Sequence, residues 1–254
     1  MSDSAVQIEA TPVPVPTYWI ESRQPLASLV FIIPLLVTYE FGVLLGSSQF
    51  SAVTMRNGAD VWLRQFLELI GLGQYFLLPI LTVCILLAWH HTTGHPWRVS
   101  GKVLWGMAGE CLLLTIVLRL LLQLQGLLMQ TVAGPIEMSM TESAQQVFAK
   151  LVLFLGAGIY EELLFRLILL SLLIWILKHL GVESTTRIVM AVLLSSMLFA
   201  AAHHIGPHGE EFHGFFFSFR VLAGCFFSVL FIYRGFGIAA GTHAGYDILV
   251  GLFA

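Results

Sequence analysis

The chain has 254 residues, of which 57% are hydrophobic and only 11% are charged, and its mean hydropathy is +0.87. An ordinary soluble domain carries about 25% charged residues, and a globule of this size cannot hide so much apolar surface. The composition therefore excludes a soluble or disordered chain and requires lipid as the main solvent. The net charge of −3 excludes a basic nucleic-acid binder, and the three cysteines lie inside apolar runs, which argues against a disulfide framework.

Residues 1–24 predict a polar leader that precedes the first apolar segment. A Pro-Val-Pro-Val-Pro stretch within it favours an extended, solvated conformation. Because no basic segment precedes the first apolar run, we do not expect a cleaved signal peptide.

Seven segments are apolar enough, and most are long enough, to cross a bilayer, which takes about 20 residues. In chain order they are 25–46, 73–89, 103–128, 147–177, 188–202, 214–233 and 238–253. The fourth is too long for one straight crossing, and Gly156 and Gly158 are its expected bend points. The segment 57–73 lies between the first two spans. In a helix, its residues Val61, Phe66, Leu67 and Ile70 would form an apolar stripe and Arg64 and Glu68 a charged side, which predicts a short interfacial helix. The expected fold class is an all-α polytopic membrane bundle.

The placement of Lys and Arg between the spans predicts the orientation of the chain. If the N-terminus is cytoplasmic, the outer segments carry two such residues, Arg56 and Arg64. The inner segments then carry six, which are Arg23, Arg98, Lys102, Lys178, Arg187 and Arg234. Since basic residues accumulate on the cytoplasmic side, we expect the N-terminus inside and the C-terminus outside.

Ionisable side chains inside the spans require an explanation, because placing each charge at the centre of a membrane helix costs about 2.5–3.5 kcal/mol of insertion free energy. They are Glu40, Glu110, Arg119, Glu161, Glu162, Arg166 and Asp247, with Arg220 near enough to a helix end to reach the interface.

The densest group is Glu161-Glu162-x3-Arg166. Glu162 and Arg166 are four residues apart, in the order that favours an ion pair. Glu161 is rotated by about 100° and has no obvious partner on its own helix. An acid fixed by arginine beside an acid free to take a proton suits general base catalysis, while a purely structural ion pair is the alternative interpretation.

Two histidine motifs lie in later spans. Phe199-x3-His203 ends the fifth span, and its alanines at 200–202 allow another backbone to approach closely. His243 and Asp247 are four residues apart on one face of the seventh span. A lone histidine in a helix is usually structural, but two of them together with a paired-glutamate helix favour a functional site.

The three motifs in this order, each in a separate apolar helix, resemble the CPBP family of intramembrane glutamic endopeptidases. That family includes the CAAX prenyl proteases and the bacterial Abi-like proteins. The resemblance covers about residues 145–254, expected to form a CPBP-like protease core, and leaves residues 25–144 as additional transmembrane helices. It implies a multi-pass protein of a bacterial inner membrane, acting on a membrane-anchored or lipid-modified protein or peptide without a cofactor or a metal.

The resemblance also implies a role for each matched position. Glu161 resembles the general base, which activates water together with His203, while Glu162 and Arg166 form the supporting pair. His243 and Asp247 resemble the oxyanion side of the site. Because many members carry Asn where this chain has Asp247, that residue either donates as a protonated acid or orients His243 as a carboxylate.

Two other classes of function remain open at this point. A metal-dependent protease can be built from Glu161, His203 and His243, although the chain has no HExxH sequence. A second metal set could form at the outer surface from His203, His204, His208, His213, Glu210 and Glu211, where a solvated acidic turn is the simpler interpretation. A non-catalytic scaffold or transporter would use the charges only for packing.

Straight spans place the motifs at different depths. His203 would lie near the outer end of its helix and His243 near the inner start of its own. A shared site then requires tilted helices, a re-entrant stretch around 206–214, or a different number of spans.

Overall fold

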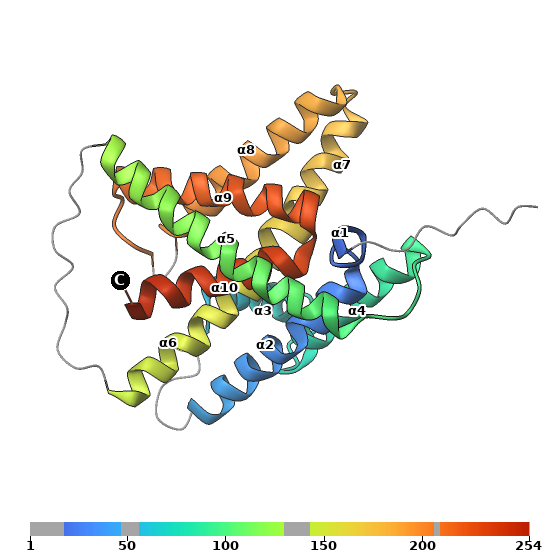
Figure 1. Ribbon diagram of the computed structural model, residues 1–254, viewed down its shortest axis with the longest axis horizontal. Coiled ribbons are helices and arrows are strands. Elements are labelled where there is room, and N and C mark those ends of the chain that lie inside the picture. The colour runs from blue at the N-terminus through green and yellow to red at the C-terminus, as the bar shows by residue number, and fades with distance from the viewer. Residues whose placement is uncertain (1–17, 47–55, 130–142, 206–208, 254) are drawn as a thin grey trace, which may run out of the picture.

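A computed structural model describes residues 18–46, 56–129, 143–205 and 209–253 (Figure 1). Every regular element in these ranges is a helix. In chain order the helices are α1 (Tyr18–Glu21), α2 (Pro25–Gly46), α3 (Gly58–Leu69), α4 (Leu77–Thr93), α5 (Gly101–Leu128), α6 (Ala144–Gly156), η1 (Ala157–Glu161), η2 (Leu163–Leu170), α7 (Ser171–His179), α8 (Ser184–Ala202), α9 (Gly214–Arg234) and α10 (Phe236–Phe253). The expected all-α bundle is confirmed, and each predicted apolar segment contains a helix, although 73–89 is helical only from Leu77.

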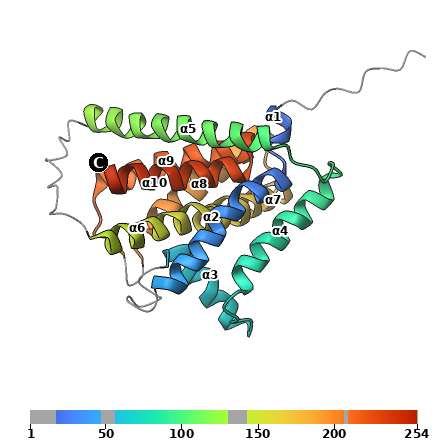
Figure 2. The same ribbon diagram turned by 60° about the horizontal axis from the view of Figure 1, so that its bottom comes forward.

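The surface of the bundle is that of a membrane protein. Among the described residues, α2, α5, α8 and α9 are each long and apolar enough to cross a bilayer, and α4 is a shorter apolar helix of 17 residues. Helix α5 forms one side of the molecule, with α3 and α4 on the opposite side (Figure 2). Trp105, Leu112 and Leu113 of α5 are 82%, 66% and 62% exposed. Side chains of this kind are stable there because the surrounding solvent is lipid.

The long fourth apolar segment forms one continuous helix with a widened middle rather than a glycine kink. Between Ala157 and Leu170 the backbone has π-helical turns, interrupted only at Glu162. Such turns occur frequently at functional sites. The two glycines serve close packing: a Cβ on Gly156 would lie 2.2 Å from the Tyr39 ring, and one on Gly158 would lie 2.6 Å from the carbonyl oxygen of Ala240. The expected bend points are therefore contact points.

Helix α10 lies inside the bundle, in contact with α2, α5, α6, α9 and η1. Its residues 236–244 are all buried. Small residues let the neighbours come close: a Cβ on Gly237 would lie 2.8 Å from Cα of Ser28 in α2. This packing places His243 next to η1.

The end of the expected leader is folded, in contrast to the prediction of an extended segment for 1–24. Residues 1–17 lie outside the described part of the chain, but α1 packs on α5. Tyr18 donates to the Glu110 carboxylate, which also accepts from Arg234 at 2.6 and 2.7 Å. Arg234 in turn reaches Ser22 at 2.8 Å. The half-buried Glu110 of α5 thus fixes α1 through these donors.

Helix α3 forms where the interfacial helix was predicted, but Asp60 and Arg64 face inward, while Leu67 is buried and Glu68 is exposed as the prediction had them. Asp60 is fully buried and Arg64 ion-pairs with it, while Phe66 and Ile70 are 59% and 52% exposed. The prediction expected these apolar residues to form a stripe opposite the charges. The inward direction of the charges follows from Glu40 of α2, a buried acid that pairs with Arg64 at 2.9 Å.

Candidate active site

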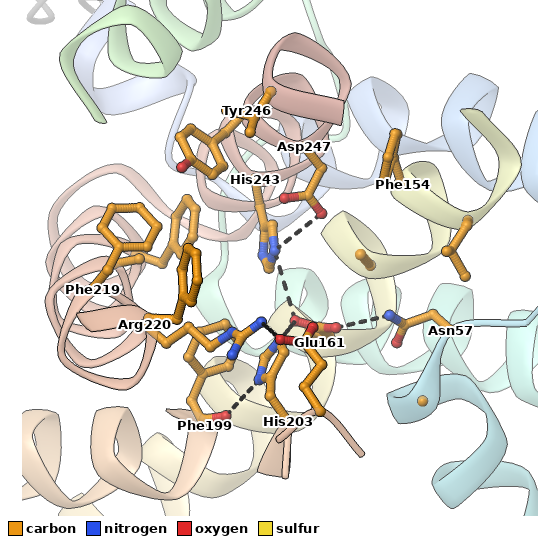
Figure 3. A pocket seen from close by; sticks show the side chains of 18 of the residues that line it. Asn57, Phe154, Glu161, Phe199, His203, Phe219, Arg220, His243, Tyr246 and Asp247 are labelled. Carbon is orange, nitrogen blue, oxygen red and sulfur yellow. Dashed lines mark hydrogen bonds and ion pairs between the residues drawn. The ribbon is translucent and has the colours of Figure 1, made fainter. Parts of the chain in front are cut away.

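The three sequence motifs meet at one place in the structure (Figure 3). Glu161 ends η1, His203 follows the last residue of α8, and His243 lies in the middle of α10. Oε2 of Glu161 lies 3.7 Å from Nε2 of His243 and 4.0 Å from Nε2 of His203. The depth problem posed by straight spans therefore does not arise, because the helices bring the end of α8 against the middle of α10 and of the long fourth segment.

Glu162 and Arg166 form the ion pair that the sequence predicted, at 2.8 Å and with both side chains fully buried. The same oxygen of Glu162 accepts a hydrogen bond from Nδ1 of His243 at 2.7 Å. Arg166 lies over the ring of Phe199 at 4.4 Å and near that of Phe227 at 5.3 Å. The pair thus links the fourth apolar segment to α8, α9 and α10.

The hydrogen bonds of the two histidines determine which ring nitrogen faces Glu161. Nδ1 of His203 lies 2.9 Å from the carbonyl oxygen of Phe199. A carbonyl only accepts, so this nitrogen carries the proton, and Nε2 faces Glu161 with a lone pair in the neutral ring. In His243, Nδ1 donates to Glu162, so Nε2 is again the nitrogen that faces Glu161.

Asp247 is the third acidic residue beside His243. Its Oδ2 is 3.6 Å from Nε2 of His243, which is an ion-pair separation and too long for a hydrogen bond. The ring of His243 stacks on Phe227, with centroids 4.5 Å apart and planes at 11°. His243 is therefore held on one face by an aromatic ring, and its ring nitrogens lie within 4 Å of Glu161, Glu162 and Asp247.

A cavity of about 540 Å³ opens onto these groups. Glu161, His203, His243 and Asp247 all line it. The remaining wall is largely apolar and includes Leu122, Leu153, Phe154, Phe199, Phe216, Phe219, Ala223, Phe227, Tyr246 and Val250. A second cavity of about 230 Å³ lies along α3 and shares Glu161 and His203 with the first. The carboxyl and imidazole groups of these four residues therefore line a cavity whose wall is largely apolar.

Arg220 and Glu210 form a further charged pair at the cavity. The side chain of Arg220 was expected to extend towards the membrane interface, but it turns inward towards His203 and Glu161 (Figure 3). It pairs with Glu210 at 2.6 Å. The carbonyl oxygen of Glu210 lies 2.9 Å from Nδ1 of His204, so this part of the acidic turn folds back against the end of α8.

Asn57 is a residue of the site that sequence reasoning missed. Its Nδ2 donates to Oε1 of Glu161 at 2.8 Å, and it lines both cavities. The local sequence signals only that Asn57 is a good N-cap for α3. A contact between residues 104 positions apart leaves no trace in a local pattern.

The described residues include no group of three or more His, Cys, Asp or Glu side chains arranged to hold a metal ion. His208, part of the alternative outer metal set, lies outside the described part of the chain. His204 and Glu210 of that set are engaged in the turn and the ion pair described above.

Residues 143–249 match the family described as type II CAAX prenyl endopeptidase Rce1-like. This segment, less than half of the chain, is therefore similar to the Rce1-like family. It contains the three motifs from Glu161 to Asp247, whereas Asn57 lies outside it. No curated protein and no solved structure gives a significant match to the chain. The apolar helices and the similarity of 143–249 to this family together indicate an integral membrane protein with a segment similar to a peptidase family.

Proposed function

We propose that the protein is an intramembrane endopeptidase in which Glu161 and His203 activate a water molecule for the hydrolysis of a peptide bond. The observation that carries this proposal is the position of Oε2 of Glu161, a buried atom without a hydrogen-bond partner among the described residues, 4.0 Å from Nε2 of His203. Two hydrogen bonds of about 2.8 Å from a single water molecule span such a separation.

In the proposed reaction, the water donates one proton towards Glu161 and a hydrogen bond to Nε2 of His203, which leaves an oxygen lone pair free. As this oxygen bonds to the carbonyl carbon, Glu161 takes the proton and the carbonyl oxygen becomes an oxyanion. The carbon–nitrogen bond then breaks, and the proton held by Glu161 passes to the leaving amine. Atoms and charge balance without any further reactant, as general acid–base catalysis requires.

His243 and Asp247 would serve the oxyanion side of the site. When Nε2 of His243 is protonated, it can donate to the developing oxyanion. The Asp247 carboxylate at 3.6 Å and the Glu162 carboxylate at 2.7 Å both favour the positive ring. We therefore propose that Asp247 acts as an ionised group that supports His243, rather than as the donor itself.

The proposed substrate is a membrane-anchored or lipid-modified protein or peptide. The apolar wall of the cavity is compatible with a hydrocarbon chain, and the family name points to prenylated CAAX sequences. We further propose a bacterial inner-membrane location with the N-terminus in the cytoplasm, on the distribution of Lys and Arg.

The test is the Glu161→Gln substitution in purified, detergent-solubilised protein, assayed with an internally quenched farnesylated CAAX peptide. Loss of the base should lower the rate about 10²- to 10⁴-fold while the protein stays folded. Glu183→Gln is a matched acid-to-amide control, since Glu183 caps α8 on the exposed surface and the amide oxygen can still accept one of its two cap hydrogen bonds. Undiminished cleavage by Glu161→Gln would remove Glu161 from the mechanism, and a wild-type protein that cleaves no such peptide would favour a scaffold or transporter.

A further inference from the structure

Asn57 makes two hydrogen bonds that fix its side-chain amide in one orientation. Its Oδ1 accepts from the backbone N–H of Ala59 at 2.8 Å, which caps α3, and its Nδ2 donates to Oε1 of Glu161 at 2.8 Å. Asn57 is only 9% exposed. The amide therefore joins the first turn of α3 to the carboxylate that faces the cavity.

Capping alone does not require asparagine. Serine and aspartate cap helices about as well, because only the side-chain oxygen is needed. The Nδ2 donor is additional, and its acceptor is Oε1 of Glu161. Since Oε1 is engaged in this way, Oε2 is the oxygen left to face His203 and His243.

The start of α3 is held in place by a buried charge network centred on Asp60. This carboxylate accepts hydrogen bonds from Arg64 at 2.6 Å and from the Tyr39 hydroxyl at 2.7 Å, and it ion-pairs with Arg56. Burial by itself lowers the pKa of the Arg56 guanidinium, but the charge and hydrogen bond of Asp60 outweigh it and raise the pKa above its usual value. Arg56 thus stays charged, and the residue preceding Asn57 is fixed to α3.

The same network reaches the other partner of the contact. Arg64 pairs with Glu40 of α2 at 2.9 Å, and Glu40 accepts from the Tyr160 hydroxyl at 2.7 Å. Tyr160 is fully buried and directly precedes Glu161. Asn57 and Glu161 are therefore held from both sides by one set of charges.

We propose that Asn57 is a positioning residue for Glu161, through which α3 sets the orientation of the general base. The inference rests on the proposed function, and it extends the reacting assembly to a helix outside residues 143–249. Asn57 acts through Glu161 and needs no contact with the substrate. Its loss should therefore lower kcat and leave KM unchanged.

Two substitutions separate positioning from capping. Asn57→Ser keeps a capping oxygen, but its shorter side chain does not reach Glu161, whereas Asn57→Ala removes both bonds. If Asn57 positions Glu161, both variants should lose about 10- to 100-fold in kcat, as expected for a lost hydrogen bond to a charged group, with KM within twofold of wild type. The melting temperature of the serine variant should fall less than that of the alanine variant, because serine keeps the cap of α3.

Asn57→Asp is a third test variant. It retains the side-chain shape and the cap of α3 but replaces the Nδ2 donor with an oxygen beside Glu161. Its kcat should be no higher than that of Asn57→Ser. Wild-type kcat in Asn57→Ser, with a loss only in Asn57→Ala, would reduce Asn57 to a helix cap and overturn the inference. In that case an inactive Glu161→Gln would still support the proposed function, whereas an inactive wild-type protein would overturn both.

Discussion

Removal of Arg166 should destabilise the protein more than any change at the reacting groups. The guanidinium is fully buried, bonds Glu162 at 2.8 Å and contacts the carbonyl oxygen of Gly224 at 3.4 Å. In Arg166→Ala, Glu162 keeps only His243 as a charged partner. Breaking a buried pair in this way typically costs about 3–5 kcal/mol, because an uncompensated charge remains.

The expected loss is large enough to measure by thermal unfolding in detergent. At roughly 2–4 °C per kcal/mol for a chain of this size, the melting temperature of Arg166→Ala should fall by on the order of 10 °C. Arg98→Ala is the matched control, since Arg98 is exposed, and its melting temperature should stay within about 1 °C of wild type, as for most surface substitutions.

A second comparison separates charge from packing. The double variant Glu162→Gln/Arg166→Met removes both charges and keeps most of the side-chain volume. It should therefore be more stable than the single variant Arg166→Met, in which the Glu162 carboxylate stays buried without its arginine. Peptidase activity should be low in every variant that changes Glu162, because Glu162 also holds Nδ1 of His243. Equal melting temperatures for wild type, Arg166→Ala and Glu162→Ala would refute the reasoning, since a buried pair cannot be removed without cost.

Three further outcomes are expected. Asp247→Asn should lower kcat/KM at all pH values, because the amide no longer supports a positive His243; retained activity that extends to higher pH would instead make residue 247 an oxyanion donor. Gly158→Ala should destabilise the protein by about 1–3 kcal/mol and reduce cleavage, because the added Cβ would lie 2.6–2.7 Å from backbone atoms of Ala240 and Ala244 in α10. An unchanged melting temperature would argue against this contact. Activity should persist in strong chelators, and stoichiometric zinc whose removal stops turnover would overturn the glutamate mechanism.

The helices could be predicted from the sequence because their cause is local. A segment in lipid must satisfy its backbone hydrogen bonds internally, so apolar runs such as 25–46 and 214–233 become helices whatever their neighbours are. The pair Glu162–Arg166 was likewise predictable, since a spacing of four residues places both side chains on one face.

The direction of the charges on α3 was not predictable from its pattern. Amphipathicity identifies two faces, but in a membrane protein the apolar face can contact lipid while the polar face packs inward. Which of the two occurs depends on Glu40 in α2, whose buried carboxylate needs the cation of Arg64.

The sequence by itself determined the helices, their apolar character, and the membership of Glu161, His203 and His243 in three motifs typical of one family. Only the tertiary structure decided how these groups meet. The contacts of Glu161 with Asn57 and of Glu162 with His243 join residues 104 and 81 positions apart. Periodicity reports the faces of a single helix, whereas these contacts depend on how closely α10 and α3 pack against η1, which is set by small residues and buried charges on several helices at once.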